Sequence, residues 1–257
     1  MTVPRTPGPA ARYRRLRWFN LLVGAALAAQ AAYMLAASNA LELPVTASFL
    51  TADPVAVRDG TPPETVFRIP IGPAVALFLL LAAVDHWTVA APGVHRWYER
   101  RLAERANYAR WIEYSVSASL MVVLIGLFVG IRDLAAVIGL FGVNSAMILF
   151  GMLMERQQRP GPGADWSAYW FGTLAGLVPW VAIAVYIAQP PEVPGFVYAI
   201  SVIQFLLFAG FGVTMALQYA RVWRWRNYLT GEVTYILLSL IAKSLLAWLI
   251  FANVLRT

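Results

Sequence analysis

Seven long apolar runs dominate the sequence, and each is long enough to cross a membrane as a helix. A hydrocarbon core about 30 Å thick is spanned by roughly 20 residues at 1.5 Å per residue. Proline, glycine and charged residues gather in the shorter stretches between the runs, where helices are expected to end. The pattern predicts an all-α membrane protein with seven transmembrane helices, near residues 18–38, 69–91, 107–130, 133–154, 167–188, 194–220 and 229–254.

The longest connection, near residues 39–68, has a different pattern from the runs that flank it. Prolines and glycines interrupt it, and short β-branched pieces follow Pro44 and Glu64. Such pieces predict a small β-hairpin that covers one mouth of the bundle or contacts a neighbouring chain, although a solvated connector is an equal alternative. No other connection is long enough for a soluble domain, so we expect residues 1–257 to form a single seven-helix domain.

Composition narrows the function classes. The chain is 60% hydrophobic and 13% charged, which is typical of a polytopic membrane protein. It has no cysteine, which excludes disulfides, thiolate metal sites and cysteine nucleophiles. The net charge of +7 comes from arginines between the apolar runs, a distribution that favours a membrane surface over nucleic acid.

The arginines also predict the orientation. Fifteen of the nineteen lie at the N-terminus or in the second, fourth and sixth connections, and four lie on the opposite side: Arg58, Arg68, Arg132 and Arg256. Short basic loops tend to stay in the cytoplasm. We therefore expect a multi-pass protein of the cell membrane with a cytoplasmic N-terminus and an extracellular C-terminus. The pair Arg14 and Arg15 also resembles a twin-arginine export signal, but the run that follows is of full span length and six more follow it.

Lys243 is the only lysine, and it lies inside the seventh run. A cation at the centre of a bilayer costs about 2.5–3.5 kcal/mol on insertion scales, so its presence needs a reason. Arginine stays protonated, whereas a desolvated lysine amine can lose its proton and condense with an aldehyde to form a Schiff base. Lys243 is therefore a candidate attachment point for a carbonyl compound, with a purely structural ion pair as the alternative.

A buried ammonium needs a counterion, and Glu113 is the leading candidate. Helical spacing places Ser117 and Met121 on the same face as Glu113, and Ser239 lies one turn before Lys243. The alternative is that Glu113 pairs with the neighbouring Arg110 at the membrane interface.

Depth is a difficulty for the pairing of Glu113 with Lys243. Lys243 lies about 14 residues, or about 21 Å, into its predicted helix, whereas Glu113 lies only about six residues into its own. The lysine side chain leans back toward the start of its helix, which removes part of the difference. A start of the third helix near Leu102 would remove more.

Several segments resemble the heliorhodopsin family: RWFNLL (17–22), RWIEYSVSASLM (110–121), GVNSAMI (142–148) and YILLSLIAKSLLAW (235–248). The resemblance covers nearly the whole chain. Heliorhodopsins are retinal-binding, seven-helix, rhodopsin-like bundles with a cytoplasmic N-terminus, the orientation that the arginine count predicts independently.

The resemblance implies that Lys243 forms a Schiff base with all-trans retinal and that Glu113 is its counterion. It also implies a pocket formed by Ser117, Met121, Ser239, Asn144, Met147, Ile148, Trp180 and Phe208. Without the resemblance, these methionines and aromatic residues would be ordinary core.

The resemblance further implies a polar cavity that contains His86 and Glu155. Family members carry another histidine on the first helix, but this chain has Leu27 there, which puts a two-histidine cavity in doubt. A structural role for His86 and an interfacial one for Glu155, beside Arg156, are the alternatives.

Pump rhodopsins carry acidic residues at two positions where this chain has Leu124 and Ser239. Because no second carboxylate is available there to relay protons, we expect a light sensor that does not pump ions and is not an enzyme. The resemblance implies a homodimer, and a sensor needs a cytoplasmic partner, which the sequence does not identify. An ion transporter or channel is the main alternative, and a lysine-dependent membrane enzyme is another. The sequence shows no continuous row of polar residues across the bundle, which a transporter would need, and no evident second catalytic acid, which an enzyme would need.

Overall fold

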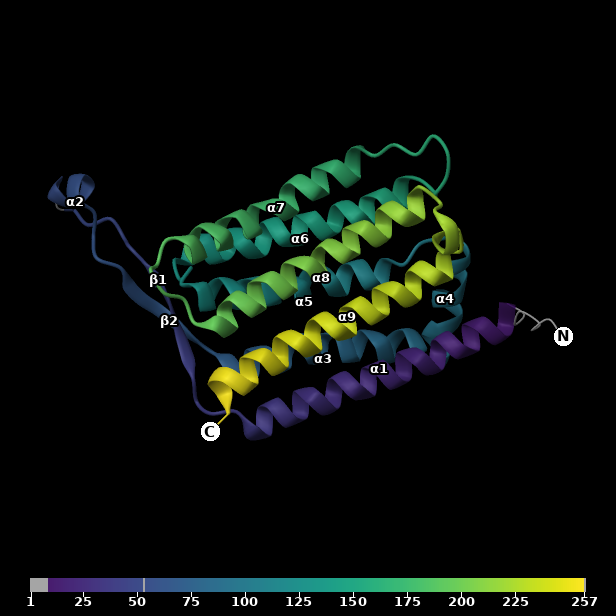
Figure 1. Cartoon of the computed structure of the whole chain (residues 1–257), viewed down its shortest axis with the longest axis horizontal. Coiled ribbons are helices and arrows are strands. Elements are labelled where there is room, and N and C mark those ends of the chain that lie inside the picture. The colour runs from purple at the N-terminus through teal and green to yellow at the C-terminus, as the bar shows by residue number, and fades with distance from the viewer. Residues whose placement is uncertain (1–8, 53, 257) are drawn as a thin grey trace.

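A computed structural model describes residues 9–52 and 54–256. In this part of the chain, seven helices are long and apolar enough to cross a membrane, which confirms the predicted fold class (Figure 1). They are α1 (Pro9–Ala37), α3 (Ile71–Ala90), α5 (Tyr108–Val129), α6 (Leu134–Gln157), α7 (Ser167–Ala188), α8 (Gly195–Tyr219) and α9 (Tyr228–Ile250), which a π-helical turn, η2 (Phe251–Leu255), extends.

Local signals fix several helix ends. The side chain of Asn107 accepts a hydrogen bond from the backbone N–H of Arg110 at the start of α5, and Asp133 and Asn227 cap α6 and α9 in the same way. Gly130 ends α5 with a φ of 103°, a left-handed conformation that favours glycine. The first helix begins by Pro9, well before the predicted start near residue 18, because its arginines continue the helix beyond the apolar run. Arg5 lies outside the described residues.

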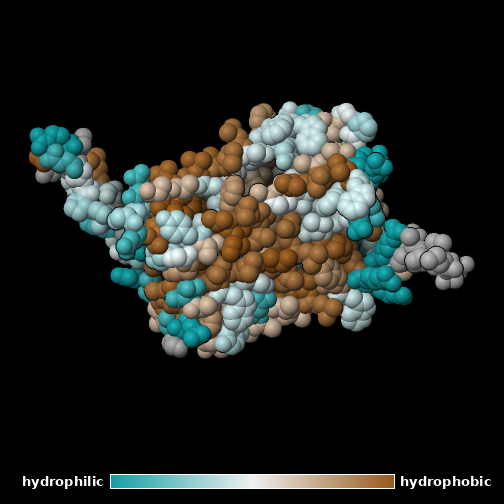
Figure 2. Space-filling view, viewed as in Figure 1, coloured by the Kyte–Doolittle hydropathy of each residue, from teal (hydrophilic) through white to brown (hydrophobic). Residues whose placement is uncertain are grey.

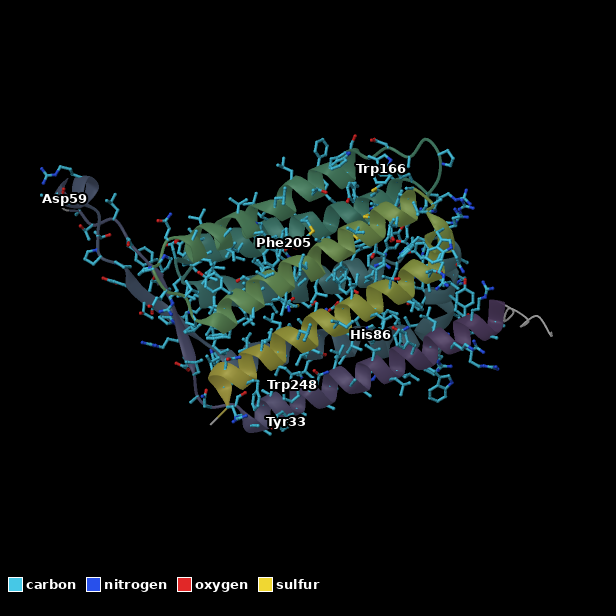
Figure 3. All side chains as sticks on the ribbon, in the orientation of Figure 1. Tyr33, Asp59, His86, Trp166, Phe205 and Trp248 are labelled. Carbon is cyan, nitrogen blue, oxygen red and sulfur yellow. The ribbon has the colours of Figure 1, made fainter. Side chains whose placement is uncertain are left out.

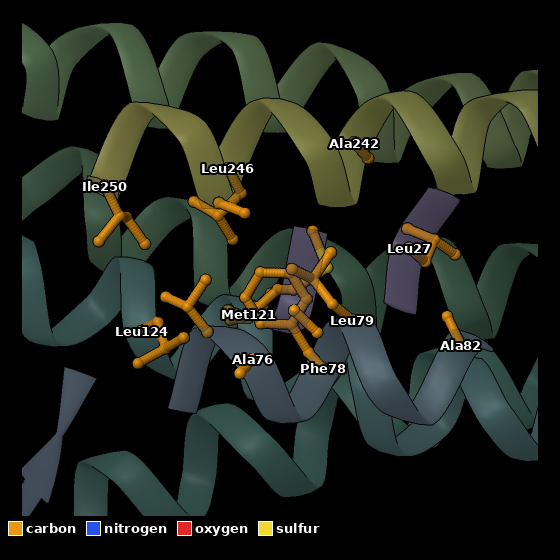
Figure 4. Packing of buried hydrophobic residues seen from close by; sticks show 14 of the residues in the cluster. Leu27, Ala76, Phe78, Leu79, Ala82, Met121, Leu124, Ala242, Leu246 and Ile250 are labelled. Atoms are coloured by element: carbon orange, nitrogen blue, oxygen red, sulfur yellow. The ribbon is translucent and has the colours of Figure 1, made fainter. Parts of the chain in front are cut away.

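The helices form one bundle whose core lies between α1, α3, α5 and α9. Leu246 of α9 packs near Phe78 and Leu79 of α3 and near Met121 of α5 (Figure 4), and all four side chains are buried. Between helices in a membrane, such packing stabilises through van der Waals contact rather than through release of water. The outer helices α7 and α8 bury smaller shares of their surfaces than α5 does.

The predicted hairpin is present. Strands β1 (Glu42–Ala47) and β2 (Glu64–Pro70) pair antiparallel, and a short helix, α2 (Pro54–Asp59), lies between them. The hairpin projects from one end of the bundle (Figure 1). The backbone N–H of Thr46 donates to the carbonyl of Arg132 at 2.8 Å, which attaches the hairpin to the connection between α5 and α6.

Besides α2, two further short helices lie in connections that the sequence did not predict to be helical: α4 (Pro92–Ala103) and a 3-10 turn, η1 (Trp223–Arg226). Both lie at the end of the bundle where α1 begins, called here the N-terminal end; the opposite end is the hairpin end (Figure 1). Hydrophobic residues form a broad belt between the two ends, and hydrophilic residues gather beyond it (Figure 2). This distribution is that of a multi-pass membrane protein.

Candidate functional site

The structure brings Lys243 and Glu113 together. Lys243 is 2% exposed, and its Nζ lies 3.5 Å from Oε1 of Glu113. Nζ also donates a hydrogen bond to Oγ of Ser239 at 2.8 Å and lies 4.8 Å from the centre of the Tyr114 ring. A buried ammonium thus has one carboxylate, one hydroxyl and one aromatic face as its neighbours.

The difference in depth between the two residues is removed by the relative placement of the helices. An earlier start of the third helix, near Leu102, is not the reason, since α5 begins at Tyr108, close to the predicted start at residue 107. The side chain of Asn107 instead donates to Glu232, four residues into α9, so α9 begins about 6 Å nearer the N-terminal end than α5 does. The bond from Lys243 to Ser239 returns the amine by a further turn, about 5 Å.

A cavity of about 320 Å³ adjoins the amine. Seven of the residues that the sequence analysis singled out line it: Met121, Met147, Ile148, Trp180, Phe208, Ser239 and Lys243. Glu113, Ser117 and Asn144 do not line it. The Ser117 hydroxyl and Oδ1 of Asn144 are buried without a hydrogen-bond partner among the described residues, whereas Nδ2 of Asn144 donates to Ser119 at 3.1 Å.

Aromatic rings and glycines shape this cavity. The Trp180 ring meets the Phe205 and Phe208 rings edge-on, at centroid distances of 5.5 and 5.4 Å. On α7, a Cβ added at Gly176 would lie 2.8 Å from Cγ of Met147, so this position admits no larger residue without a shift. Phe205 lies on α8 (Figure 3).

The sequence analysis did not identify most of the lining contributed by α7. It consists of Ala168, Tyr169, Gly172, Thr173, Gly176 and Leu177, besides Trp180. These residues recur at intervals of three and four, which is the helical face that contains Trp180. Extending that face backwards from Trp180 would have found them.

A second group of charges lies toward the N-terminal end. Arg110 is 3% exposed, and its Nη1 and Nη2 atoms lie 2.6 Å from Glu232 and 2.6 Å from Glu155, respectively. The alternative that Glu113 pairs with Arg110 is therefore wrong. Glu155 is only 2% exposed, so it is not an interfacial charge either.

Neutral donors complete this Arg110 cluster. Glu155 accepts hydrogen bonds from Trp111 Nε1 at 2.7 Å and from the Tyr228 hydroxyl at 3.0 Å. Glu232 accepts one from the Tyr98 hydroxyl at 2.9 Å. Burial of Tyr98, with the nearby Glu232 carboxylate, raises the pKa of this hydroxyl well above its ordinary value, so it remains a donor.

The sequence analysis did not identify Glu232. It lies close to the start of a predicted helix, where a carboxylate is ordinarily an interfacial charge. Its partners belong to α4 and α5, more than a hundred residues away in the sequence. No local pattern signals such a pairing.

His86 lies in a separate network. It is 6% exposed, and its Nδ1 lies 2.7 Å from Oδ1 of Asn20, whose own Nδ2 donates to the carbonyl of Leu16 (His86 is labelled in Figure 3). Leu27 is fully buried in the hydrophobic core. Among the described residues no hydrogen bond joins His86 to Glu155, so the structure does not bring these two residues together.

Gln204 holds α8 against the backbone next to Lys243. It is fully buried, and its Nε2 donates to the carbonyl of Ala242 at 2.9 Å. In the sequence it was one of a few isolated polar residues inside apolar runs. The structure makes it a link between α8 and the helix turn that carries the amine.

Comparison with known proteins gives one family match. The model of the family described as Heliorhodopsin matches residues 16–255, which is nearly the whole chain. No curated protein matches the sequence.

Proposed function

Because this chain belongs to the heliorhodopsin family, whose members are retinal-binding rhodopsins, we propose that it is a light sensor that carries all-trans retinal on Lys243 as a protonated Schiff base. Glu113 is the counterion. One observation carries the proposal: a buried amine, 3.5 Å from a buried carboxylate, lines an apolar cavity of about 320 Å³. A lysine that only balanced a charge would need no cavity beside it.

The lining fits an apolar polyene. The volume falls in the range of about 300–1,000 Å³ that is usual for small-molecule sites. The walls are mainly methionine, aromatic, aliphatic and glycine residues. When bound, retinal supplies the light-absorbing group whose change of shape displaces charge near the lysine.

The protein residues hold that charge in place. Glu113 supplies the negative charge that compensates a protonated nitrogen at Lys243, and exclusion of water strengthens their attraction. Ser239 accepts a hydrogen bond from the amine and orients it. Ser117 and Asn144 add buried polar atoms nearby that are available to ordered water.

A sensor fits better than a pump. Leu124 is buried core, and Ser239 is neutral, so neither relays a proton toward the hairpin end. Among the described residues, the other carboxylates that are nearly fully buried, Glu155 and Glu232, both belong to the Arg110 cluster, on the opposite side. Directional proton transfer from Lys243 toward the hairpin end of the bundle is therefore unsupported.

The arginine distribution supports a cytoplasmic N-terminal end. Arg110 must be removed from the count because it is buried and paired, but fourteen arginines against four remain. A light-driven rearrangement of helices is then read at that end by a signalling partner. The family resemblance supports a homodimer, which cross-linking in native membranes would test.

Addition of all-trans retinal to membranes that contain the protein tests the proposal. We expect a visible absorption band, and borohydride reduction followed by peptide mass analysis should find a retinyl adduct on Lys243. Illumination of cell suspensions should produce no sustained pH change. A colourless preparation would contradict retinal binding at this lysine, and a sustained pH change would favour a pump.

A further inference from the structure

A second cavity, of about 440 Å³, lies at the N-terminal end between α1 and α4. It is lined by Ala10, Tyr13, Arg14, Arg17, His95 and Glu99, and it shares no residue with the cavity beside Lys243. Nothing in the proposed light-sensing function uses it. Two of its six lining residues are arginines.

Both arginines have guanidinium nitrogens that are available to donate further hydrogen bonds. Nε of Arg17 donates to the carbonyl of Ala90 at 2.8 Å, which fixes the side chain at the end of α3. Among residues 9–52 and 54–256, the terminal nitrogens of Arg17 and the whole guanidinium of Arg14 have no hydrogen-bond or ion-pair partner. A fixed guanidinium with free terminal nitrogens loses little side-chain entropy when it binds an anion.

One carboxylate faces these arginines, and it is already engaged. Oε1 of Glu99 lies 3.2 Å from Nε2 of His95, and Nδ1 of the same ring lies 3.2 Å from the carbonyl of Val89. Two guanidinium groups therefore face one carboxylate, which leaves the cavity with net positive charge whatever the protonation of His95. Tyr13, whose hydroxyl is a further hydrogen-bond donor, also lines the cavity.

The cavity lies at the level of lipid head groups. The α1 span has 28 residues, about 42 Å, which exceeds a hydrocarbon core of about 30 Å. The arginines of its first two turns show that the excess lies at the N-terminal end, where hydrophilic residues gather (Figure 2). Trp18, one residue after Arg17, is 62% exposed, as expected of a tryptophan at the membrane interface.

We propose that this cavity binds the phosphate of an anionic phospholipid from the adjacent leaflet. Arg14 and Arg17 contact the phosphate oxygens, and Tyr13 donates a third hydrogen bond. A guanidinium matches the spacing of two phosphate oxygens, and basic pockets at this level of a membrane protein are suited to lipid head groups. Free phosphate has the same chemistry, but the leaflet presents its phosphates continuously at this depth.

Reconstitution in nanodiscs of phosphatidylcholine with a minor fraction of phosphatidylglycerol tests the proposal. After mild delipidation, native mass spectrometry counts the lipids retained by the protein. We expect preferential retention of phosphatidylglycerol. The double variant Arg14→Gln/Arg17→Gln should weaken it roughly thirtyfold, because one arginine near a phosphate contributes about fivefold. Equal retention of the two lipids by the wild-type chain would overturn the proposal.

The matched control is Arg96→Gln/Arg100→Gln. It removes the same charge from exposed positions of α4 outside the cavity, and we expect less than a twofold effect. A loss as large as that of the cavity variant would show that only general surface charge attracts the lipid, which overturns the proposal. Glu99→Gln, which removes the opposing carboxylate, should strengthen retention.

Two further measurements keep the test decisive. Arg14→Gln alone leaves the Arg17 bond to Ala90 intact and should still weaken retention about fivefold; no loss would mean that the double variant acts through the fold. Inorganic phosphate is then titrated against the retained lipid. Displacement at low millimolar concentration would identify a free-phosphate site and overturn the lipid assignment.

Discussion

Two groups of buried charges lie along α5 and α9, three residues apart on α5 and eleven apart on α9, and their hydrogen-bonding groups are satisfied to different degrees. The Arg110 cluster joins its guanidinium to two carboxylates at 2.6 Å, and neutral donors occupy their remaining positions. Lys243 has one hydrogen bond and a looser contact of 3.5 Å with Glu113, whose Oε1 has no hydrogen-bond partner among the described residues.

The difference separates a structural role from a chemical one. A buried ion pair stabilises a fold only when its geometry is close and its remaining donors and acceptors are occupied. The Arg110 cluster comes close to that condition, because its carboxylates accept several hydrogen bonds and only Nε of Arg110 lacks a partner among the described donors of that guanidinium. It ties α4, α5, α6 and α9 together at one end. The Lys243 pair does not meet it, and a cavity adjoins it. An unsatisfied buried group calls for an explanation, and the proposed covalent attachment of a ligand at Lys243 would supply one.

Replacement of the attachment point should have the largest effect. Lys243→Arg keeps a positive charge opposite Glu113 but removes the amine that condenses with an aldehyde. We expect complete loss of the visible band after retinal addition, with the helical circular dichroism retained. A band of undiminished intensity in this variant would place the attachment elsewhere.

Disruption of the Arg110 cluster should affect stability most. Arg110→Met leaves two carboxylates buried without a cation, and loss of one partner from a buried pair costs about 3–5 kcal/mol. Thermal unfolding in detergent should therefore begin at a clearly lower temperature. Arg100→Met, at an exposed position, is the control and should unfold like the wild type. Addition of Glu155→Gln and Glu232→Gln to Arg110→Met should restore part of the loss.

Glu113→Gln sharpens the comparison, because it removes one charge, the negative one, from the looser pair. We expect a smaller change of unfolding temperature than for Arg110→Met but a large shift or loss of the visible band, since a protonated nitrogen at Lys243 loses its counterion. The absorption spectrum and the unfolding curve, measured on the same preparation, test both expectations. An unshifted band would remove Glu113 from the role of counterion.

Substitution of a glycine in the wall of the cavity beside Lys243 should have the smallest effect. Gly176→Ala places a methyl group 2.8 Å from Cγ of Met147, and overpacking of this kind costs about 1–3 kcal/mol. Because Met147 is flexible, we expect weaker or slower pigment formation rather than its loss. Gly139→Ala is the control, since its added Cβ meets nothing within 4 Å. Equal rates of pigment formation in the two variants would show that this wall does not limit the ligand.

Local properties of the sequence sufficed for much of the architecture. The seven spans follow from apolar length alone, and the hairpin follows from two β-branched pieces between turn residues. The short helix α4 was not predicted, because its polar residues outweigh its apolar ones and the stretch resembles a loop. The start of α1 was placed too late for a related reason, since hydropathy does not detect a helix that continues into the head-group layer.

The candidate site, too, was predictable from the sequence only in part. Lys243 and Glu113 could be identified from the sequence as candidate functional residues. A charge inside an apolar run is energetically costly, so its presence indicates a specific role. Which carboxylate each cation faces was decided only by the tertiary structure. The offset between α5 and α9 brings Glu113 level with the Lys243 amine and Arg110 level with Glu232. Rotation and axial offset of helices depend on packing between residues far apart in the sequence, and no periodicity within one segment encodes them.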